Sequence, residues 1–273
     1  MFRPSDIIIE AFTKRLEQEY DLLFGDTEPQ YRYTLTRVAN TVLHLIARSD
    51  ALYHDLDHTL LVTQVGFRIL HGRIVRENNV GPLEWIHFVA SLLCFAVGMV
   101  RGICPGDDAV SCVIDAKNNR IDLPKGATDG FLWPYFADRS KLYVLHYFRD
   151  HPILDARRMA EYIEYARFPP PSDRNFDTRT YPGLLRACHL IGAVADPNFM
   201  SKMPALMWEL VESNMTQQLG YNSVAEWQKD YPNFFWFELY PLIADGVEYL
   251  SYTARGRIWL ATMQAQVLKL EMD

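Results

Sequence analysis

Helical periodicity is the feature of this chain that most constrains its fold. Apolar residues recur at three- and four-residue intervals along most of the 273 residues, as Ile9, Phe12, Leu16, Tyr20 and Leu23 do near the N-terminus. This spacing places them on one face of a helix. Strand signals are nearly absent, because alternation is rare and no Asn-Gly or Asp-Gly turn joins two β-branched runs. The sequence therefore predicts an all-α fold.

The same periodicity predicts where the helices begin and end. Ser5 is a candidate N-cap for the first helix, and Gly25 ends it. The other predicted helices cover residues 31–48, 57–77, 83–100, 139–149, 153–166, 181–195, 200–219, 223–229, 234–252 and 255–270. No disordered linker and no internal repeat separates them. We therefore expect a single helical domain over residues 1–273.

Charge, cysteine usage and apolar runs exclude several classes of protein. A net charge of −7 argues against a nucleic-acid binder, although a pocket can still be locally basic for a small anionic substrate. The longest uncharged run, Trp85 to Val100, is short for a membrane span and predicts a buried core helix. The four cysteines form no C-x-x-C pair, and the N-terminus lacks a signal-peptide pattern. We expect a cytoplasmic protein with no membrane span.

The segment with the most chemistry is residues 53–58, Y-H-D-L-D-H. His54 and His58 are four residues apart, so in a helix both imidazoles share one face and can bind one metal ion. Asp55 and Asp57 add oxygen ligands, or acceptors that orient the imidazoles. The alternative is a solvated helix start, in which the acidic residues stabilise the helix dipole and the histidines are incidental. Four ionisable groups in five residues favour a functional role.

This segment also resembles a known signature. Residues 53–65 are similar to the Y-H-N-x-x-H-A-x-D-V-x-Q motif of the cyclic-nucleotide phosphodiesterases, which belong to the HD-domain metal-dependent phosphohydrolases. Similarity continues in C-F-A-V-G-M-V-R-G-I-C-P-G-D at 94–107, R-F-P at 167–169 and L-I-G-A-V-A-D-P-N at 190–198. The resemblance covers about residues 30–250 and implies a compact helical domain of the HD/phosphodiesterase type.

The resemblance also implies roles for particular residues. Active members hold a divalent ion such as zinc, manganese, magnesium or iron with a His, an adjacent His-Asp pair on the next core helix, and a later Asp. His58 matches the first ligand, and His54 matches the general acid that protonates the leaving oxygen. The ion would polarise the phosphoryl group of a small phosphate-containing ligand and lower the pKa of an attacking water.

The chain departs from this pattern at three ligand positions. Phe95 and Ala96 stand where the His-Asp pair belongs, and neither side chain has a lone pair to donate to a metal. His189 stands at the counterpart of the later Asp, and Asp196 lies two helical turns further on. His58 and His189 alone fall short of the three protein ligands usual for catalytic zinc.

A rearranged ligand set is one way to restore a metal site. His54, Asp57, His58 and His189, with His87 two turns before Phe95 or the carboxylate of Asp196, can hold an ion such as zinc. The alternative for His87 is a hydrogen-bonded core residue, since a histidine on an apolar helix usually has that role.

Arg101 lies just past the predicted 83–100 helix, before the turn residues 105–107. It can grip an anionic oxygen at a pocket mouth, or it can simply complement the negative end of the helix dipole. The aromatic residues within 231–240 are more typical of a core than of a base-stacking platform.

Two functional hypotheses follow. In the first, the chain is a metal-dependent phosphohydrolase or phosphodiesterase with an altered ligand set, which acts on or binds a small phosphate-containing ligand. In the second, it is a catalytically silent member of that fold and serves as a regulatory protein that binds a ligand, a protein partner or a second copy of itself. The loss of two donors predicts less than one tightly bound divalent ion per chain. It also predicts that Phe95 and Ala96 are packed in the core.

Overall fold

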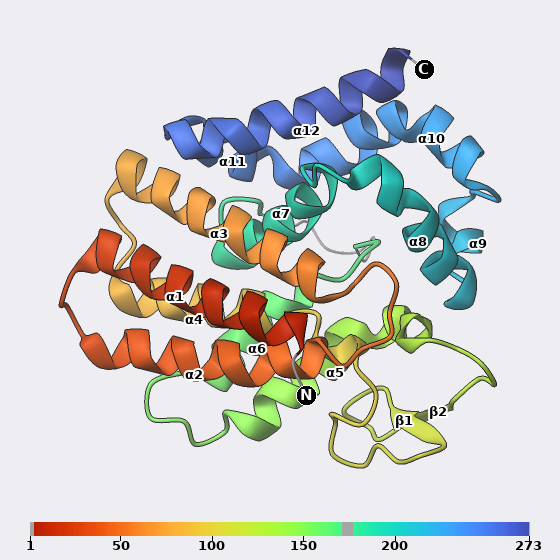
Figure 1. The fold of residues 1–273 in the computed structure, drawn as a ribbon, viewed down its shortest axis with the longest axis horizontal. Helices are drawn as coiled ribbons and strands as arrows, with labels where there is room; N and C mark the ends of the chain where they lie inside the picture. Colours follow the sequence, from red (N-terminus) through yellow and green to blue (C-terminus); the bar gives the residue numbers. More distant parts are fainter. Residues whose placement is uncertain (1–2, 171–176, 273) are drawn as a thin grey trace.

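The computed structural model describes residues 3–170 and 177–272, and helices dominate them (Figure 1). The α-helices, in chain order, are α1 (Pro4–Phe24), α2 (Pro29–Ile46), α3 (Leu56–Glu77), α4 (Pro82–Cys94), α5 (Phe136–Tyr147), α6 (Ala156–Glu164), α7 (Tyr181–Val194), α8 (Phe199–Glu212), α9 (Thr216–Leu219), α10 (Val224–Asn233), α11 (Tyr240–Ser251) and α12 (Ala254–Met272). Short 3₁₀ helices, Val97–Met99 and Asp129–Tyr135, flank the 100–128 loop, and a π-helical turn, Phe234–Leu239, joins α10 to α11. The predicted all-α fold is confirmed.

One small sheet departs from the helical pattern. β1 (Ser111–Val113) pairs antiparallel with β2 (Arg120–Asp122) at one end of the molecule (Figure 1). Three-residue strands are too short to show alternation, and the connecting residues 114–119 contain neither Asn-Gly nor Asp-Gly. For these reasons the sequence does not reveal the hairpin.

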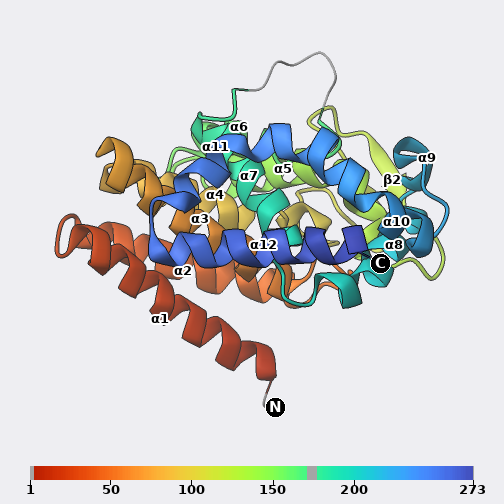
Figure 2. The same ribbon diagram turned by 90° about the horizontal axis from the view of Figure 1, so that it is seen from above.

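The helices pack around a central pair. α3 and α7 lie against each other, α11 covers both, and the α1–α2 pair lies on the side away from α12 (Figures 1 and 2). Close approach of α3 and α7 depends on Gly192, because a Cβ there would lie 3.0 Å from the Cα of Val62. Val62 follows His58 by one turn, and Gly192 follows His189 by about one turn. The packing that requires this glycine therefore brings the two histidines together.

Several helix ends differ from the predicted ones. Gly25 ends α1 as predicted, but Ser5 is wrong as its cap, because the helix begins at Pro4 and no side chain caps it. The helix predicted over 83–100 ends at Cys94. Ser140 of α5 explains this stop: its hydroxyl donates to the Phe95 carbonyl at 2.8 Å and accepts from the Gly98 N–H at 2.8 Å. The helix predicted over 200–219 breaks at Asn214, whose φ is +58°.

The apolar run around α4 is a core segment. Among the described residues, Pro82–Met99 is the one stretch long and apolar enough to cross a membrane, but 83% of it is buried inside the fold. Burial of this kind is typical of a core helix. Phe95 is fully buried and Ala96 nearly so. The prediction that both residues are packed in the core is confirmed.

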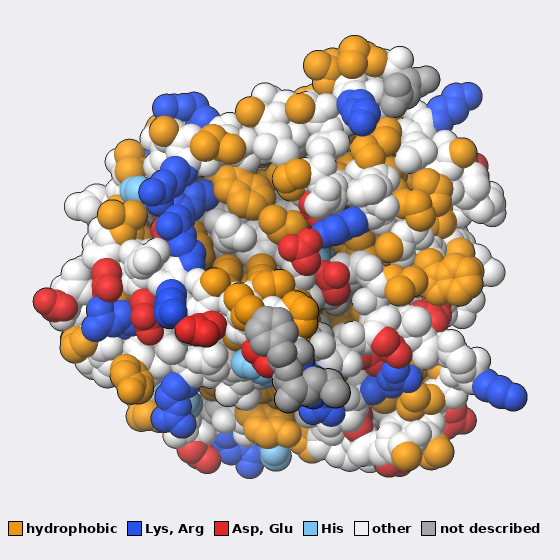
Figure 3. Space-filling model, viewed as in Figure 1, with side chains coloured by type: hydrophobic (Ala, Val, Ile, Leu, Met, Phe, Trp, Pro, Cys, Tyr) orange, Lys and Arg blue, Asp and Glu red, His pale blue; other side chains and the backbone are white. Residues whose placement is uncertain are grey.

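The surface carries both signs of charge. On the face shown in Figure 3, basic and acidic side chains are interspersed among apolar ones. Large apolar side chains that reach the surface include Trp208 of α8 and Phe237 of the π-helical turn.

Candidate functional site

Three buried histidines converge in the middle of the fold. One ligand nitrogen from each of His54, His58 and His189 lies within 4.8 Å of the other two. His54 comes from the segment before α3, His58 from the first turn of α3, and His189 from the middle of α7. No side chain of the three is more than 5% exposed. The chain therefore places three imidazoles at one point that water hardly reaches.

The N-terminal end of α3 determines where His54 and His58 place their imidazole rings. Asp55 is the N-cap of this helix, and its Oδ1 accepts from the His58 N–H at 2.9 Å. His54 therefore lies outside the helix, and the predicted placement of both imidazoles on one helical face is wrong. The alternative interpretation of this segment is a helix start with acidic residues at the positive end of the helix dipole, and Asp55 lies at that end of α3 as its N-cap.

Glu209 of α8 orients His54, and the sequence analysis did not identify it. The Glu209 carboxylate lies 2.6 Å from His54 Nδ1 and also accepts from the backbone N–H of Tyr53 at 2.7 Å. With Nδ1 engaged in this way, His54 Nε2 carries the free lone pair. Glu209 is fully buried on the same helix face as Met203 and Leu206. An acidic residue on an apolar helix face is the one signal that could have pointed to it.

The other two histidines present nitrogens that have no hydrogen-bond partner among the described residues. These are His58 Nε2 and His189 Nδ1, both buried. The remaining His189 nitrogen is held by a hydrogen bond to the Ala166 backbone. Burial, with repulsion from the neighbouring imidazoles, lowers the pKa of His58 well below its usual range and that of His189 to about 3. Both rings are therefore neutral at pH 7, which is the form that binds metals.

Phe95 lies beside this cluster. Its ring centroid is 5.0 Å from that of His189 and 6.2 Å from that of His58. The phenyl ring thus occupies space next to two candidate ligands and offers them no donor atom. The third imidazole comes from His54 instead.

The remaining predicted acidic residues are engaged elsewhere. Asp57 is largely exposed and forms an ion pair with Lys202 of α8. Asp196 is buried, but its carboxylate lies 2.7 Å from Lys202 Nζ and accepts from the Asn198 N–H at 2.7 Å. Neither joins the three-histidine cluster, because a lysine neutralises each of them. These contacts occupy both carboxylates, so neither Asp57 nor Asp196 is a ligand of the predicted metal site.

His87 and Arg101 also lie outside the cluster. His87 donates through Nδ1 to the Leu83 carbonyl at 2.7 Å and accepts through Nε2 from the Asp155 N–H at 2.8 Å. No lone pair is left for a metal, so His87 is the hydrogen-bonded core residue of the alternative reading. Arg101 pairs with Asp50 at 2.6 Å and with Asp129, and two carboxylates therefore hold it in the 100–128 loop.

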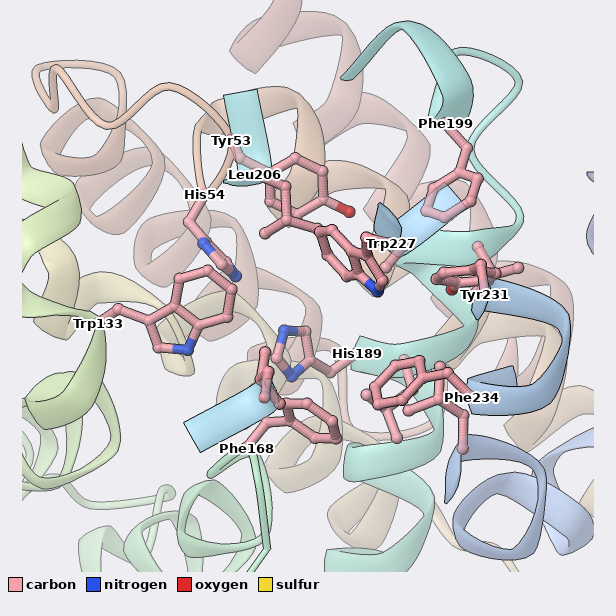
Figure 4. A pocket seen from close by; sticks show the side chains of 15 residues that line it. Tyr53, His54, Trp133, Phe168, His189, Phe199, Leu206, Trp227, Tyr231 and Phe234 are labelled. Carbon is pink, nitrogen blue, oxygen red and sulfur yellow. The ribbon is translucent and has the colours of Figure 1, made fainter. Parts of the chain in front are cut away.

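A small cavity of about 60 Å³ opens beside His54 and His189 (Figure 4). Its walls are almost entirely apolar and aromatic. They consist of Tyr53, His54, Trp133, Phe168, His189, Leu190, Ala193, Val194, Phe199, Leu206, Leu219, Trp227, Tyr231, Phe234 and Leu239. Figure 4 shows Phe199, Tyr231 and Phe234 on the side opposite His54 and Trp133. Part of the aromatic segment predicted as core therefore lines this cavity.

Comparison with known proteins gives a family. The Npun_R2479-like family matches residues 2–273. The chain belongs to this family. No curated protein and no solved structure matches the chain.

The arrangement in this Npun_R2479-like chain fits a metal ion on chemical grounds. Three imidazoles form an all-nitrogen donor set, which suits zinc and other late first-row ions better than magnesium or calcium. The carboxylate of Glu209 behind His54 is the partner that metal-binding histidines usually have. Three histidines also leave a fourth coordination position for a water or a substrate.

Proposed function

We propose that this Npun_R2479-like chain is a metal-dependent hydrolase in which His54, His58 and His189 hold one zinc-type ion. The observation that carries the proposal is the pair of buried nitrogens, His58 Nε2 and His189 Nδ1, that have no protein partner. Each buried polar atom left unpaired costs about 1–3 kcal/mol. A fold retains such atoms where a ligand completes them. Two of them within one three-histidine cluster favour a metal.

The roles of the residues follow from their contacts. Glu209 holds His54 so that Nε2 faces the cluster, and the Ala166 backbone does the same for His189 Nδ1. A bound divalent ion supplies Lewis-acid activation of a water and of the oxygen of the scissile group. His54 then acts as a ligand rather than as the general acid that the phosphodiesterase resemblance implies. This ligand set belongs to the altered HD-phosphohydrolase hypothesis, with Phe95 and Ala96 in place of the lost pair.

A second candidate function has its own support. Phe95 fills space beside two of the histidines, and the adjoining cavity is apolar. These observations favour a catalytically silent protein that binds a small ligand at this site. Metal content separates the two candidates, because the silent protein needs no ion.

The test is elemental analysis of protein purified without chelators or an affinity tag. In contrast to the substoichiometric metal that the loss of donors at Phe95 and Ala96 predicts, we expect one zinc ion per chain that survives dialysis. Most of it should be lost in His58→Ala and in His189→Ala. His87→Ala is the matched control, because both nitrogens of that ring are already engaged. Its zinc content should equal that of the wild type. Hydrolysis of bis-nitrophenyl phosphate then checks for phosphodiesterase activity.

Two results would count against the metal centre. One is zinc content well below one per chain after dialysis against zinc-containing buffer. The other is stoichiometric zinc that neither His58→Ala nor His189→Ala removes. Either result leaves the silent ligand-binding protein as the better candidate.

A further inference from the structure

The walls of the cavity restrict what it can hold. Among the described residues that line it, none is Lys, Arg, Asp or Glu. Three polar atoms on its lining side chains are nevertheless buried without a hydrogen-bond partner in the part of the chain that the structure describes: Trp133 Nε1, Trp227 Nε1 and Tyr53 Oη. An indole N–H can only donate, and a phenol can donate. An occupant that carries hydrogen-bond acceptors would therefore satisfy these groups.

A second hollow, of about 520 Å³, adjoins this cavity. The two share Phe168, Leu219 and Phe234 as a common wall. The outer hollow is also lined by Asp230 and Glu238, and its described lining includes no Lys or Arg. Hydrogen bonds from Asn233 and Tyr221 lower the pKa of Asp230, so that it is ionised at neutral pH. An approaching anion therefore meets a negative potential.

We propose that the cavity binds a small, slender, uncharged molecule with a carbonyl-type head, which enters from the outer hollow past Phe168, Leu219 and Phe234. The inner volume admits a head of a few atoms, and the rest of the molecule extends into the outer hollow. This inference rests on the proposed function in one respect: it places the head beside the three histidines, where the ion would act on it.

The charge of the occupant follows from the cost of burial. A free phosphate or carboxylate in this cavity would find indole donors but no cationic side chain among the described lining residues. Burying an unpaired charge costs far more than burying a neutral carbonyl that accepts one or two hydrogen bonds. In the metal-free cavity an uncharged ester or amide is therefore favoured over the phosphate of the phosphodiesterase resemblance.

The test uses butyramide and butyrate, which match in shape and differ in charge. Binding is measured by isothermal titration to metal-free protein, because an ion at the histidines would itself attract the carboxylate. We expect saturable binding of butyramide, at least tenfold tighter than that of butyrate. Equal or tighter binding of butyrate would overturn the inference.

Tryptophan variants show whether the binding uses this cavity. Trp133→Phe removes one buried donor and keeps most of the ring, so butyramide should bind about three- to tenfold more weakly. Trp208→Phe is the matched control, since Trp208 lies exposed on α8 outside the cavity. Unchanged binding in both Trp133→Phe and Trp227→Phe would mean that the cavity does not hold the amide.

The two proposals fail in different ways. Butyramide binding without any zinc binding would remove the proposed function and support the ligand class. Stoichiometric zinc together with a preference for butyrate in metal-free protein would do the reverse.

Discussion

Two buried polar clusters in this fold differ in how completely the protein satisfies them. One surrounds Arg139 of α5, and the other is the three-histidine cluster of His54, His58 and His189. Both lie in the interior, and both join segments that are distant in sequence. In the first, the protein supplies a partner for every donor of the arginine. In the second, two nitrogens have none.

The Arg139 cluster holds the 100–128 loop on the helical body. Its guanidinium donates to the carbonyls of Gly98, Val100 and Val113, and makes two bonds to the Asp107 carboxylate, at 3.1 and 2.9 Å. Burial alone would raise the pKa of Asp107, but the hydrogen bonds and charge of Arg139 outweigh it and lower that pKa. All five guanidinium N–H groups are used.

This difference in hydrogen bonding distinguishes a cluster that stabilises the fold from one that can bind a ligand. A buried cluster whose members satisfy one another needs nothing from outside, so it serves the fold. A buried cluster with unpaired atoms costs stability, and a fold tolerates that cost where a ligand completes the set. Replacing a buried polar side chain with an apolar one should therefore cost much more stability in the first cluster than in the second.

The largest effect is expected in the Arg139 cluster. Arg139→Met keeps much of the volume but removes the cationic partner of the buried Asp107 carboxylate and the side-chain donors to three carbonyls, which should lower the free energy of unfolding by about 3–5 kcal/mol. Urea denaturation measures the change. Lys14→Met, which breaks an exposed pair with Glu10, is the control and should leave the free energy of unfolding nearly unchanged. A loss below about 1 kcal/mol for Arg139→Met would mean that the two clusters do not differ in their contribution to stability.

Phe95 tests how tightly the histidine end of the core is packed. Because its ring is fully buried against His189 and His58, Phe95→Ala should lower the free energy of unfolding by about 3 kcal/mol, the lower end of the range for such truncations. The same urea titration applies. A cost under about 1 kcal/mol would show that water from the neighbouring cavity readily fills the space.

The sequence predicts the helices better than it predicts their ends. Apolar periodicity marks α1, α3 and α7 to within a few residues, because it records which face is buried. The end of α4 depends instead on Ser140, a residue of another helix. No local pattern around Phe95 could show that partner.

The same division applies to the site. His54 and His58 stand out in a local motif, and the phosphodiesterase resemblance singles out His189. Glu209 and Trp133 come from distant segments with no motif of their own, so only the fold brings them to the histidines. Local chemistry thus marks the candidate ligands, and tertiary packing selects which of them meet.

Glu209 offers a milder test of the histidine cluster. Glu209→Gln keeps an acceptor for the backbone but weakens its hold on His54, and the loss of such a partner typically lowers metal affinity about 10–100-fold. Competition with a zinc-binding dye measures the change. Glu212→Gln, in the same helix but bonded to Thr128, is the control and should leave zinc affinity unchanged. Equal zinc affinity in Glu209→Gln and the wild type would place the ion elsewhere.

The smallest effect on stability is expected for His58→Leu, which therefore contrasts most clearly with Arg139→Met. His58→Leu also replaces a buried polar side chain with an apolar one of similar size, but His58 Nε2 has no protein partner to lose. In metal-free protein the free energy of unfolding should therefore change by less than about 1 kcal/mol in either direction. Added zinc should stabilise the wild type by about 2.7 kcal/mol at one hundred times its Kd, and should not stabilise the variant. Urea titrations with and without zinc measure both quantities. A loss above about 2 kcal/mol in the metal-free variant would mean that His58 serves the fold as Arg139 does, and the distinction between the two clusters would fall.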